Sequence, residues 1–184
     1  IMDNYKKNYK LLTENHVYSK DMEHDSCGVG VIASTEGKKS REIVEYGIEA
    51  LKAVWHRGAV DADGKTGDGA GIHVEIPKDF FIEKIEVTGH DYDNSEICVG
   101  MIFLPRNDYA SQESCKTIVE SELTKNDFSI YGWRQVPVNP KILGEKAFQT
   151  MPEIIQVLFK PNNSNLIDKD LERKIYETRK KIEN

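Results

Sequence analysis

Residues 51–77, LKAVWHRGAVDADGKTGDGAGIHVEIP, show most clearly how secondary-structure elements follow one another in this chain. A helical stretch ends at His56-Arg57-Gly58, where glycine permits a left-handed stop. A glycine-rich loop follows it. Residues 72–76 then alternate between apolar and polar types like a half-buried strand, which Pro77 ends. This stretch predicts a helix, a glycine loop and a strand in direct succession.

Upstream of this stretch, the sequence predicts a strand and a helix. The short Val/Ile run of residues 28–33 is typical of a strand. Ser40 can cap a helix whose apolar residues recur at spacings of 4, 3 and 4, namely Val44, Ile48, Leu51 and Trp55. Residues 1–26 lack apolar periodicity, and we interpret them as an arm whose order would have to come from docking.

Downstream, strands and helices follow in groups. Apolar runs predict strands at residues 98–104, 128–138 and 154–159, and a short amphipathic piece at 80–85. Residues 109–125 suit a helix, and a last helix begins with Asp168 as its cap. The apolar faces of these two helices contain Cys115, Ile118, Val119 and Leu123, and Leu171, Ile175, Thr178 and Ile182. This order favours an α+β layered fold over a regular βαβ repeat.

Composition and charge restrict the class of protein. The 184 residues are enough for one domain with extensions, and the charged fraction of 30% is ordinary for a globular protein. A net charge of −6, with lysines and acids interleaved, leaves no basic face for nucleic acid. The longest apolar run, residues 97–104, is far shorter than the roughly 18 residues that span a bilayer. We therefore expect neither nucleic acid nor membrane as a partner, and the polar N-terminal sequence favours a cytoplasmic or stromal-type compartment.

Three cysteines, Cys27, Cys98 and Cys115, occur without a Cys-x-x-Cys pair. They indicate neither a disulfide framework nor a metal-ligand set within the chain. Cys98 and Cys115 fall on a predicted apolar strand and a helix face, as core thiols do. Cys27 precedes the small residues GVGV, and by itself it fits two interpretations: a packed thiol, or a nucleophile.

A thiol attacks an acyl carbonyl as the thiolate, so it needs a base or a positive environment. An N-terminal cysteine can use its own α-amine, with an ordinary pKa of about 8, as that base. Cys27 would suit this chemistry at the head of a strand of small residues, once the arm in front of it had been removed.

The helix end and the loop after it also allow more than one interpretation. Arg57 could hold a carboxylate or bias a thiol toward thiolate, or it could be a surface arginine beside a turn. The loop TGDGAG, residues 66–71, lacks the Gly-Lys-Ser/Thr ending of a phosphate loop. The aspartates in and before it, Asp61, Asp63 and Asp68, lack the spacing and the closing glutamate of a calcium loop.

Four separated blocks carry a specific resemblance. They are CGVGVIAS (27–34), residues 51–77, GWRQVPVNPKILGEKAFQTMPEIIQVLF (132–159) and LERKIYETRKKIE (171–183). Together, and in register, they resemble the amino-terminal glutaminase domain of the glutamate synthase large subunit, a class II glutamine amidotransferase with the N-terminal-nucleophile hydrolase fold. The resemblance implies a four-layer αββα architecture over residues 27–184, incomplete in this chain, with residues 1–26 as a pro-segment.

The resemblance also implies roles for single residues. Cys27 would be the catalytic nucleophile, exposed by cleavage after Ser26, where such families often have alanine. Arg57 matches the arginine beside the nucleophile, where it would orient the cysteine and support the active site.

Further residues match the family's substrate-binding region. Asp68 lies in the glycine loop and would touch the site, and Trp133 and Arg134 would support the wall of the substrate-binding pocket. His56 and His73 have no assigned role as a base and are expected to be structural.

The reaction implied by the resemblance is hydrolysis of the side-chain amide of L-glutamine to glutamate and ammonia. The thiolate of Cys27 attacks, a tetrahedral oxyanion forms, and the cysteine's own amine delivers a proton to the leaving ammonia. In the family, ammonia then reaches 2-oxoglutarate in a later domain that contains FMN. Electrons arrive through an iron–sulfur cluster from a nicotinamide or ferredoxin donor, in some cases on another subunit. None of these cofactors is expected to bind this chain.

The family's oxyanion-hole Asn-Gly pair lies downstream of the block at 171–183. We therefore expect the chain to be part of a larger enzyme, inactive by itself, and a precursor while Ser26 remains attached to Cys27. Two alternatives stay open. One is an N-terminal-nucleophile amidase that acts on another amide, and the other is a non-catalytic fragment that acts only in assembly.

Overall fold

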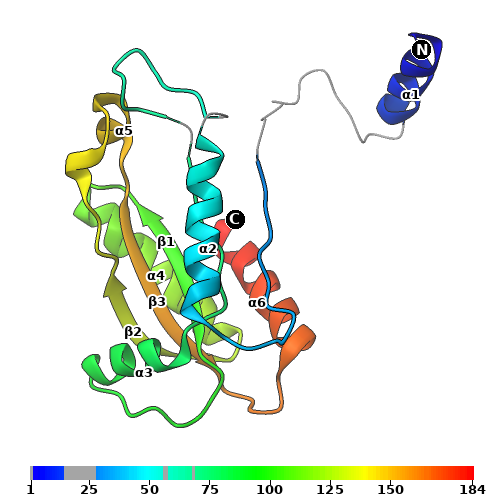
Figure 1. Ribbon diagram of the computed structural model, residues 1–184. Coiled ribbons are helices and arrows are strands. Elements are labelled where there is room, and N and C mark those ends of the chain that lie inside the picture. Colours follow the sequence, from blue (N-terminus) through cyan, green and yellow to red (C-terminus); the bar gives the residue numbers. More distant parts are fainter. Residues whose placement is uncertain (1, 15–27, 56–57, 68) are drawn as a thin grey trace. The chain divides into compact units, whose positions relative to one another are not determined.

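A computed structural model describes residues 2–14, 28–55, 58–67 and 69–184 of the chain (Figure 1). The chain divides into two compact units, Ile1–Arg57 and Gly58–Asn184. No helix in the described part of the chain is long and apolar enough to cross a membrane.

Two helices lie in the described residues of the unit Ile1–Arg57, 2–14 and 28–55. α1 spans Met2–Glu14, so half of the predicted arm is helical. Met2, Tyr5, Tyr9 and Leu12 recur at spacings of 3, 4 and 3, so the prediction that this stretch lacks periodicity is wrong. α2 spans Arg41–Ala53 and begins as predicted, because the Ser40 hydroxyl accepts the N–H of Glu42 at 3.1 Å. It ends before Trp55, which is 78% exposed, so the predicted apolar stripe of this helix is one residue shorter than expected.

The unit Gly58–Asn184 is built on an antiparallel sheet of three strands in the order β1-β3-β2. β1 spans Cys98–Leu104, β2 spans Phe128–Gln135, and the central β3 spans Glu153–Pro161. Because β3 is antiparallel to both neighbours, β1 and β2 run in the same direction, and the helix α4 (Tyr109–Lys125) connects them. β3 is buried over Ile155–Phe159, where every residue except Gln156 is apolar, as expected of the central strand of a sheet.

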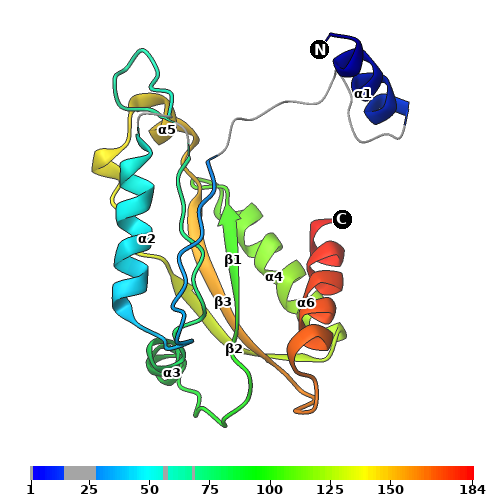
Figure 2. The ribbon, with the colours of Figure 1, turned by 45° about the vertical axis from the view of Figure 1, so that its right-hand side comes forward.

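Two helices cover one face of this sheet, α4 and α6 (Asp168–Glu183), which lie side by side in Figure 2. The core between them and the sheet consists of Cys98, Val119, Leu123, Phe128, Val157, Phe159 and Leu171. Packing is tight where Gly100 of β1 pairs with Val157 of β3, since a Cβ added to Gly100 would lie 2.7 Å from Val157 Cγ1.

A third helix, α3 (Lys78–Val87), packs on the opposite face of the sheet. The core on this side consists of Phe81, Ile85, Ile97, Tyr131 and Leu158. Val99 of β1 packs against this core. By the alternation of a strand, Met101 and Phe103 point to the same face, but they are 48% and 64% exposed. This face of the sheet is therefore only partly covered among the described residues.

A bulge in β2 determines which way its last residues point. Ile130 pairs with Phe159 and Gly132 pairs with Leu158, so Tyr131 is an extra residue in the strand. Gly132 has φ +149, and an added Cβ would lie 2.9 Å from Thr88 Cγ2. Only glycine suits both conditions, which explains its presence before Trp133.

The loop between α3 and β1 is attached to the sheet through one carboxylate. Asp93 accepts the Tyr131 hydroxyl at 2.9 Å, and it also binds the ammonium of Lys160. The hydrogen bond from Lys160, followed by bonds from Ser95 and Tyr131, lowers the pKa of Asp93 well below its usual range.

The predictions for residues 28–33 and 72–76 are wrong for secondary structure, because neither segment is a strand. Both are extended chain, but a strand also needs a hydrogen-bonded neighbour, and neither segment has one among the described residues. Val29 and Val31 are 90% and 88% exposed, and Ile72 and Val74 are 48% and 44% exposed. The alternation of apolar and polar residues predicted that one face of each segment would be buried, but it did not identify the neighbouring element that would cover that face.

Three smaller predictions also need correction. β2 ends at Gln135 rather than at residue 138. Pro137 has no N–H group and cannot donate a hydrogen bond to a neighbouring strand. Asp168 is the first residue of α6, with φ 48, and it does not cap the helix; the cap position is Ile167. Ile118 is 49% exposed, and the buried face of α4 runs instead through Gln112, Val119 and Leu123.

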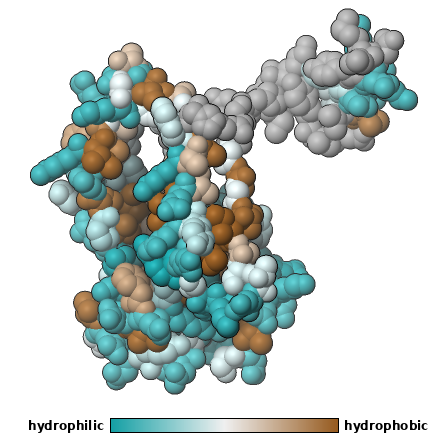
Figure 3. Space-filling model, in the orientation of Figure 1, coloured by the Kyte–Doolittle hydropathy of each residue, from teal (hydrophilic) through white to brown (hydrophobic). Residues whose placement is uncertain are grey.

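The remaining elements are short. A 3₁₀ turn, η2 (Pro140–Ile142), and a helix of six residues, α5 (Glu145–Thr150), connect β2 to β3. The observed fold is mixed α and β with an antiparallel sheet, as expected of an α+β chain. Hydrophobic and hydrophilic residues are interspersed on the face shown in Figure 3.

Candidate functional site

Three of the five predicted site residues, Cys27, Arg57 and Asp68, lie outside the described residues. Their flanking segments are described, above all the loop between Gly58 and Gly67. The other two residues, Trp133 and Arg134, lie in β2.

The loop before Asp68 is a compact turn. Val60 and Gly67 form an antiparallel bridge, and the N–H of Asp61 donates to the carbonyl of Thr66 at 2.7 Å. The N–H of Gly64 donates to the carbonyl of Asp61 at 2.9 Å, and Gly64 adopts φ +68, which favours glycine. The bridge therefore fixes Gly67, the residue before Asp68, beside the strand-like start of the loop.

The carboxylate of Asp63 organises the inside of this turn. Oδ1 accepts the N–H groups of Lys65 at 2.9 Å and Thr66 at 2.7 Å, and Oδ2 accepts the Thr66 hydroxyl at 2.5 Å. These bonds, with that from the Thr66 hydroxyl first, lower the pKa of Asp63 well below its usual range. Asp63 is therefore ionised at neutral pH, and its carboxylate is an acceptor for these three donors.

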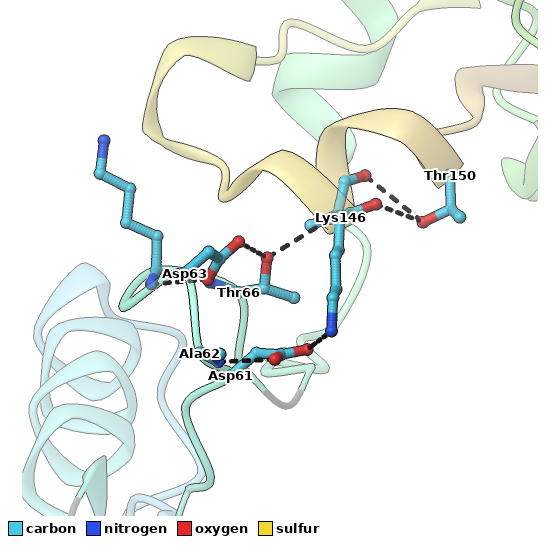
Figure 4. A network of polar contacts seen from close by, with 8 residues as sticks. Asp61, Ala62, Asp63, Thr66, Lys146 and Thr150 are labelled. Carbon is cyan, nitrogen blue, oxygen red and sulfur yellow. Dashed lines mark hydrogen bonds and ion pairs between the residues drawn. The ribbon is translucent and has the colours of Figure 1, made fainter.

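The same turn contacts α5, as Figure 4 shows. The Thr66 hydroxyl accepts the N–H of Ala147 at 3.4 Å, and the N–H of Glu145 contributes to the low pKa of Asp63. Lys146 donates to Asp61 Oδ2 at 2.7 Å. α5 has no capping side chain of its own, because Gly144 occupies its cap position. Two residues of a distant turn thus bind N–H groups that a helix start leaves free.

Gly144 is required by this contact. It is buried, and an added Cβ would lie closer than 3.0 Å to Thr66 Oγ1, Asp63 Oδ2 and the Thr66 nitrogen. We call Asp63, Thr66 and Gly144 the loop anchor. Because the anchor ends at Thr66, it holds the point from which the segment Gly67–Gly71 departs.

Trp133 and Arg134 point to opposite faces of the sheet. The indole N–H of Trp133 donates to Glu120 of α4 at 2.7 Å, and its ring packs on the core under α4 and α6. Arg134 donates to Gln156 at 2.6 Å, and its guanidinium lies 5.2 Å from the centre of the Phe80 ring on α3. The two side chains thus do not converge on one ligand from the same side.

Both residues border a shallow hollow of about 400 Å³ at the end of β2. The other lining residues are Arg106, Tyr109, Gln112, Lys116, Gln135, Glu153 and Ile155. Most of its polar groups already have protein partners: Gln112 donates to the carbonyl of Pro105 at 2.6 Å, and Gln135 binds Glu153. These contacts stabilise the junction of β2, β3 and α4.

The described cysteines lack the features of a nucleophile. Cys98 is 4% exposed, and its burial, followed by the charges of Glu96 and Glu172, raises the pKa of its thiol to about 12. Cys115 is half-buried on α4 rather than fully in the core. His73 is exposed in the extended segment before α3, and His56 lies outside the described residues.

The residues of the loop anchor were not among the predicted site residues. Their sequence signal is the pattern Asp-x-x-Thr at 63–66, in which the carboxylate binds the amide and hydroxyl three residues later. Ala147 of the partner segment lies 81 residues beyond Thr66, and that segment has no local signal that connects it to the turn.

The profile described as "Glutamine amidotransferases class-II" matches residues 27–184. The chain belongs to this family. The match begins at Cys27, the residue predicted to become the N-terminus.

Three glutamate synthases that are similar to this chain are much longer than it. The NADPH glutamate synthase large chain of Azospirillum brasilense is 51% identical over 179 residues, which are 97% of this chain and 12% of the relative. The ferredoxin-dependent glutamate synthase 2 of Arabidopsis thaliana is 40% identical over 88% of this chain and 10% of its own length. That of Pyropia yezoensis is 37% identical over 95% of this chain and 11% of its own length. The chain therefore spans about an eighth or less of these relatives.

Proposed function

We propose that residues 27–184 belong to the glutaminase domain of a glutamate synthase, which hydrolyses L-glutamine to glutamate and supplies the ammonia for transfer to 2-oxoglutarate. The observation that carries this proposal is the family match over residues 27–184, together with 51% identity to a glutamate synthase large chain. Residues 1–26 are the pro-segment in this proposal.

In the proposed mechanism Cys27 is the nucleophile. Removal of the pro-segment converts its amide nitrogen into an α-amine that can take the thiol proton. The thiolate attacks the glutamine side-chain carbonyl, ammonia leaves with a proton from the amine, and water releases glutamate from the thioester. The raised pKa of Cys98 and the position of Cys115 on a helix support the choice of Cys27 among the three thiols.

Arg57 and Asp68 complete the site in this proposal. Arg57 orients the cysteine, and Asp68 contacts the substrate from the segment that leaves the loop anchor. Trp133, which binds Glu120 of α4, and Arg134, which binds Gln156 of β3, support the wall of the substrate-binding pocket from opposite faces of β2.

The finer architecture that we propose is the four-layer αββα arrangement. α4 and α6 already form one outer layer on the sheet. On the other face, Met101 and Phe103 are incompletely covered, and Ile76, at the end of the extended segment 72–76, packs against the α3 core. A second sheet that includes residues 72–76 would cover these side chains and pair that segment.

FMN and the iron–sulfur cluster belong, in this proposal, to other parts of the enzyme. This assignment follows from the family resemblance, in which both groups lie in later domains. In this proposal a nicotinamide or a ferredoxin donates electrons to those other domains, through an electron-donating subunit in some enzymes. A cytoplasmic location remains a prediction from sequence.

The test is the Cys27→Ala variant of the complete enzyme. We expect it to lose glutamine-dependent glutamate formation and to retain ammonia-dependent formation, because ammonia bypasses the thioester chemistry. Cys115→Ala is the matched control and should retain both activities. Equal activity of Cys27→Ala and wild type with glutamine would refute the proposal, and wild-type cleavage of another amide in place of glutamine would favour a different amidase.

A further inference from the structure

The loop anchor connects the turn at residues 58–67 to α5, and few other contacts join these two segments among the described residues. α5 is too short to be stable by itself, and its cap residue has no side chain. Asp63 and Thr66 supply hydrogen-bond partners for its first turn, and Gly144 leaves the space that they occupy. The structure of the turn and that of α5 are therefore coupled.

The hydroxyl of Thr66 is central to this coupling. It donates to Asp63 Oδ2 at 2.5 Å and accepts from the N–H of Ala147 at 3.4 Å, so it connects the carboxylate to the helix. The surface pair of Asp61 with Lys146 adds little, since such exposed ion pairs contribute about 0–1 kcal/mol. Most of the attachment comes from Asp63 and Thr66.

The next residues along the chain are those of the glycine loop. Gly69 and Gly71 are exposed, and an added Cβ would meet nothing within 4 Å at either position. No side chain or backbone atom therefore lies close enough to hold these two glycines, and Thr66 and Gly67 are the attached residues before them.

We propose that Asp63 is a positioning residue for the hydrolysis of glutamine: it binds Thr66 and α5, and thereby holds the glycine loop in the conformation that binds substrate. This inference rests on the proposed function, and it concerns a residue that does not touch the substrate. A loop that occupies its binding conformation only part of the time weakens apparent affinity by that fraction.

Two pairs of variants test the inference in the complete enzyme. In Asp63→Asn, the amide oxygen can still accept the N–H groups of Lys65 and Thr66, but the NH₂ group cannot accept the Thr66 hydroxyl. Thr66→Val removes the hydroxyl while keeping the shape of the side chain, and Thr66→Ser restores the hydroxyl.

The matched control is Asp108→Asn. Asp108 accepts the N–H of Ser111 at 3.0 Å and its hydroxyl at 2.6 Å, which is the same local pattern as Asp63 with Thr66. Asp108 caps α4 and makes no hydrogen bond to α5 among the described residues. The Asp108→Asn variant therefore shows the effect of weakening such a carboxylate turn without any effect on the loop anchor.

We expect Asp63→Asn and Thr66→Val to raise the KM for glutamine about tenfold, as the loss of one hydrogen bond to a charged group would. The kcat with glutamine and the ammonia-dependent activity should stay near wild type, and Thr66→Ser should restore the KM. Asp108→Asn should keep the wild-type KM.

A wild-type KM in Asp63→Asn would overturn the inference, and so would an equal rise in Asp108→Asn. A rise in Thr66→Val that Thr66→Ser does not reverse would overturn it as well. These results differ from a failure of the proposed function, in which wild type and Cys27→Ala would use glutamine equally; that outcome would refute both proposals.

Discussion

The sheet and the loop that precedes it, both in the unit Gly58–Asn184, are stabilised by different interactions. In the sheet, Phe128, Val157 and Leu158 are each at most 1% exposed, and they pack against helices on either side. In the loop, residues 62–65 are exposed, and hydrogen bonds of Asp63 and Thr66 hold the turn. Hydrophobic burial is enough to form the sheet, whereas the loop depends on a few polar contacts with one distant helix.

This difference has a consequence for function. A packed core resists local change, because displaced side chains lose many contacts at once. A loop held by a few hydrogen bonds can open at a small free-energy cost. Segments that bind and release a substrate are drawn from such regions, and the proposed substrate loop follows this one.

The largest expected effect of a single substitution lies in the sheet. Phe128→Ala should destabilise the chain by about 3–5 kcal/mol, because it leaves a cavity between β2, β3 and α4. Val87→Ala, at a side chain that is 81% exposed, is the control and should change stability by less than about 0.5 kcal/mol. Urea denaturation measures both, and a small effect of Phe128→Ala would show that the sheet is not the stabilising core.

The second effect separates the loop from the sheet. Gly144→Ala should cost about 1–3 kcal/mol locally, because the added methyl group overlaps Thr66 and Asp63. Hydrogen exchange should become faster in residues 59–67 and 145–150, with no change in β3. The control is Gly69→Ala, where an added Cβ meets nothing within 4 Å. Faster exchange throughout β3 in Gly144→Ala would contradict the separation of the two regions.

The smallest effect concerns a polar contact of the sheet region. The pKa of Asp93 is lowered in the folded chain by Lys160, Ser95 and Tyr131, so its stabilising effect is present above the unfolded pKa of about 3.9. This effect is lost as the pH falls below that value. Asp93→Asn should therefore weaken the fall of the melting temperature between about pH 4 and pH 2. Asp91→Asn, two residues away, is the control, and an equal change in both variants would contradict the role of Asp93.

The elements of the sheet and its helices could be predicted closely from the sequence. The predicted strand 98–104 and helix 109–125 have the observed bounds of β1 and α4. Each is an apolar pattern of the right period between clear end signals, Pro105 and Asp108 among them. Such elements depend mainly on residues near in sequence, which the pattern contains.

Pairing and long-range contacts could not be predicted in the same way. Residues 28–33 and 72–76 have strand-like patterns, but pairing depends on neighbours that a local pattern does not specify. The bulge at Tyr131 also reverses the faces that simple alternation would give to Trp133 and Arg134. The attachment of Asp63 and Thr66 to α5 joins segments 81 residues apart. The assignments of Cys27, Arg57 and Asp68 come from the family resemblance and stay predictions.

The most direct test of the central claim is to react the native enzyme with a glutamine-like electrophile and to map the labelled peptide by mass spectrometry. We predict a single label on Cys27 in a chain that begins at Cys27 with a free α-amine, and none on Cys98 or Cys115. A label on either of those thiols, or a labelled Cys27 still joined to Ser26, would contradict the account.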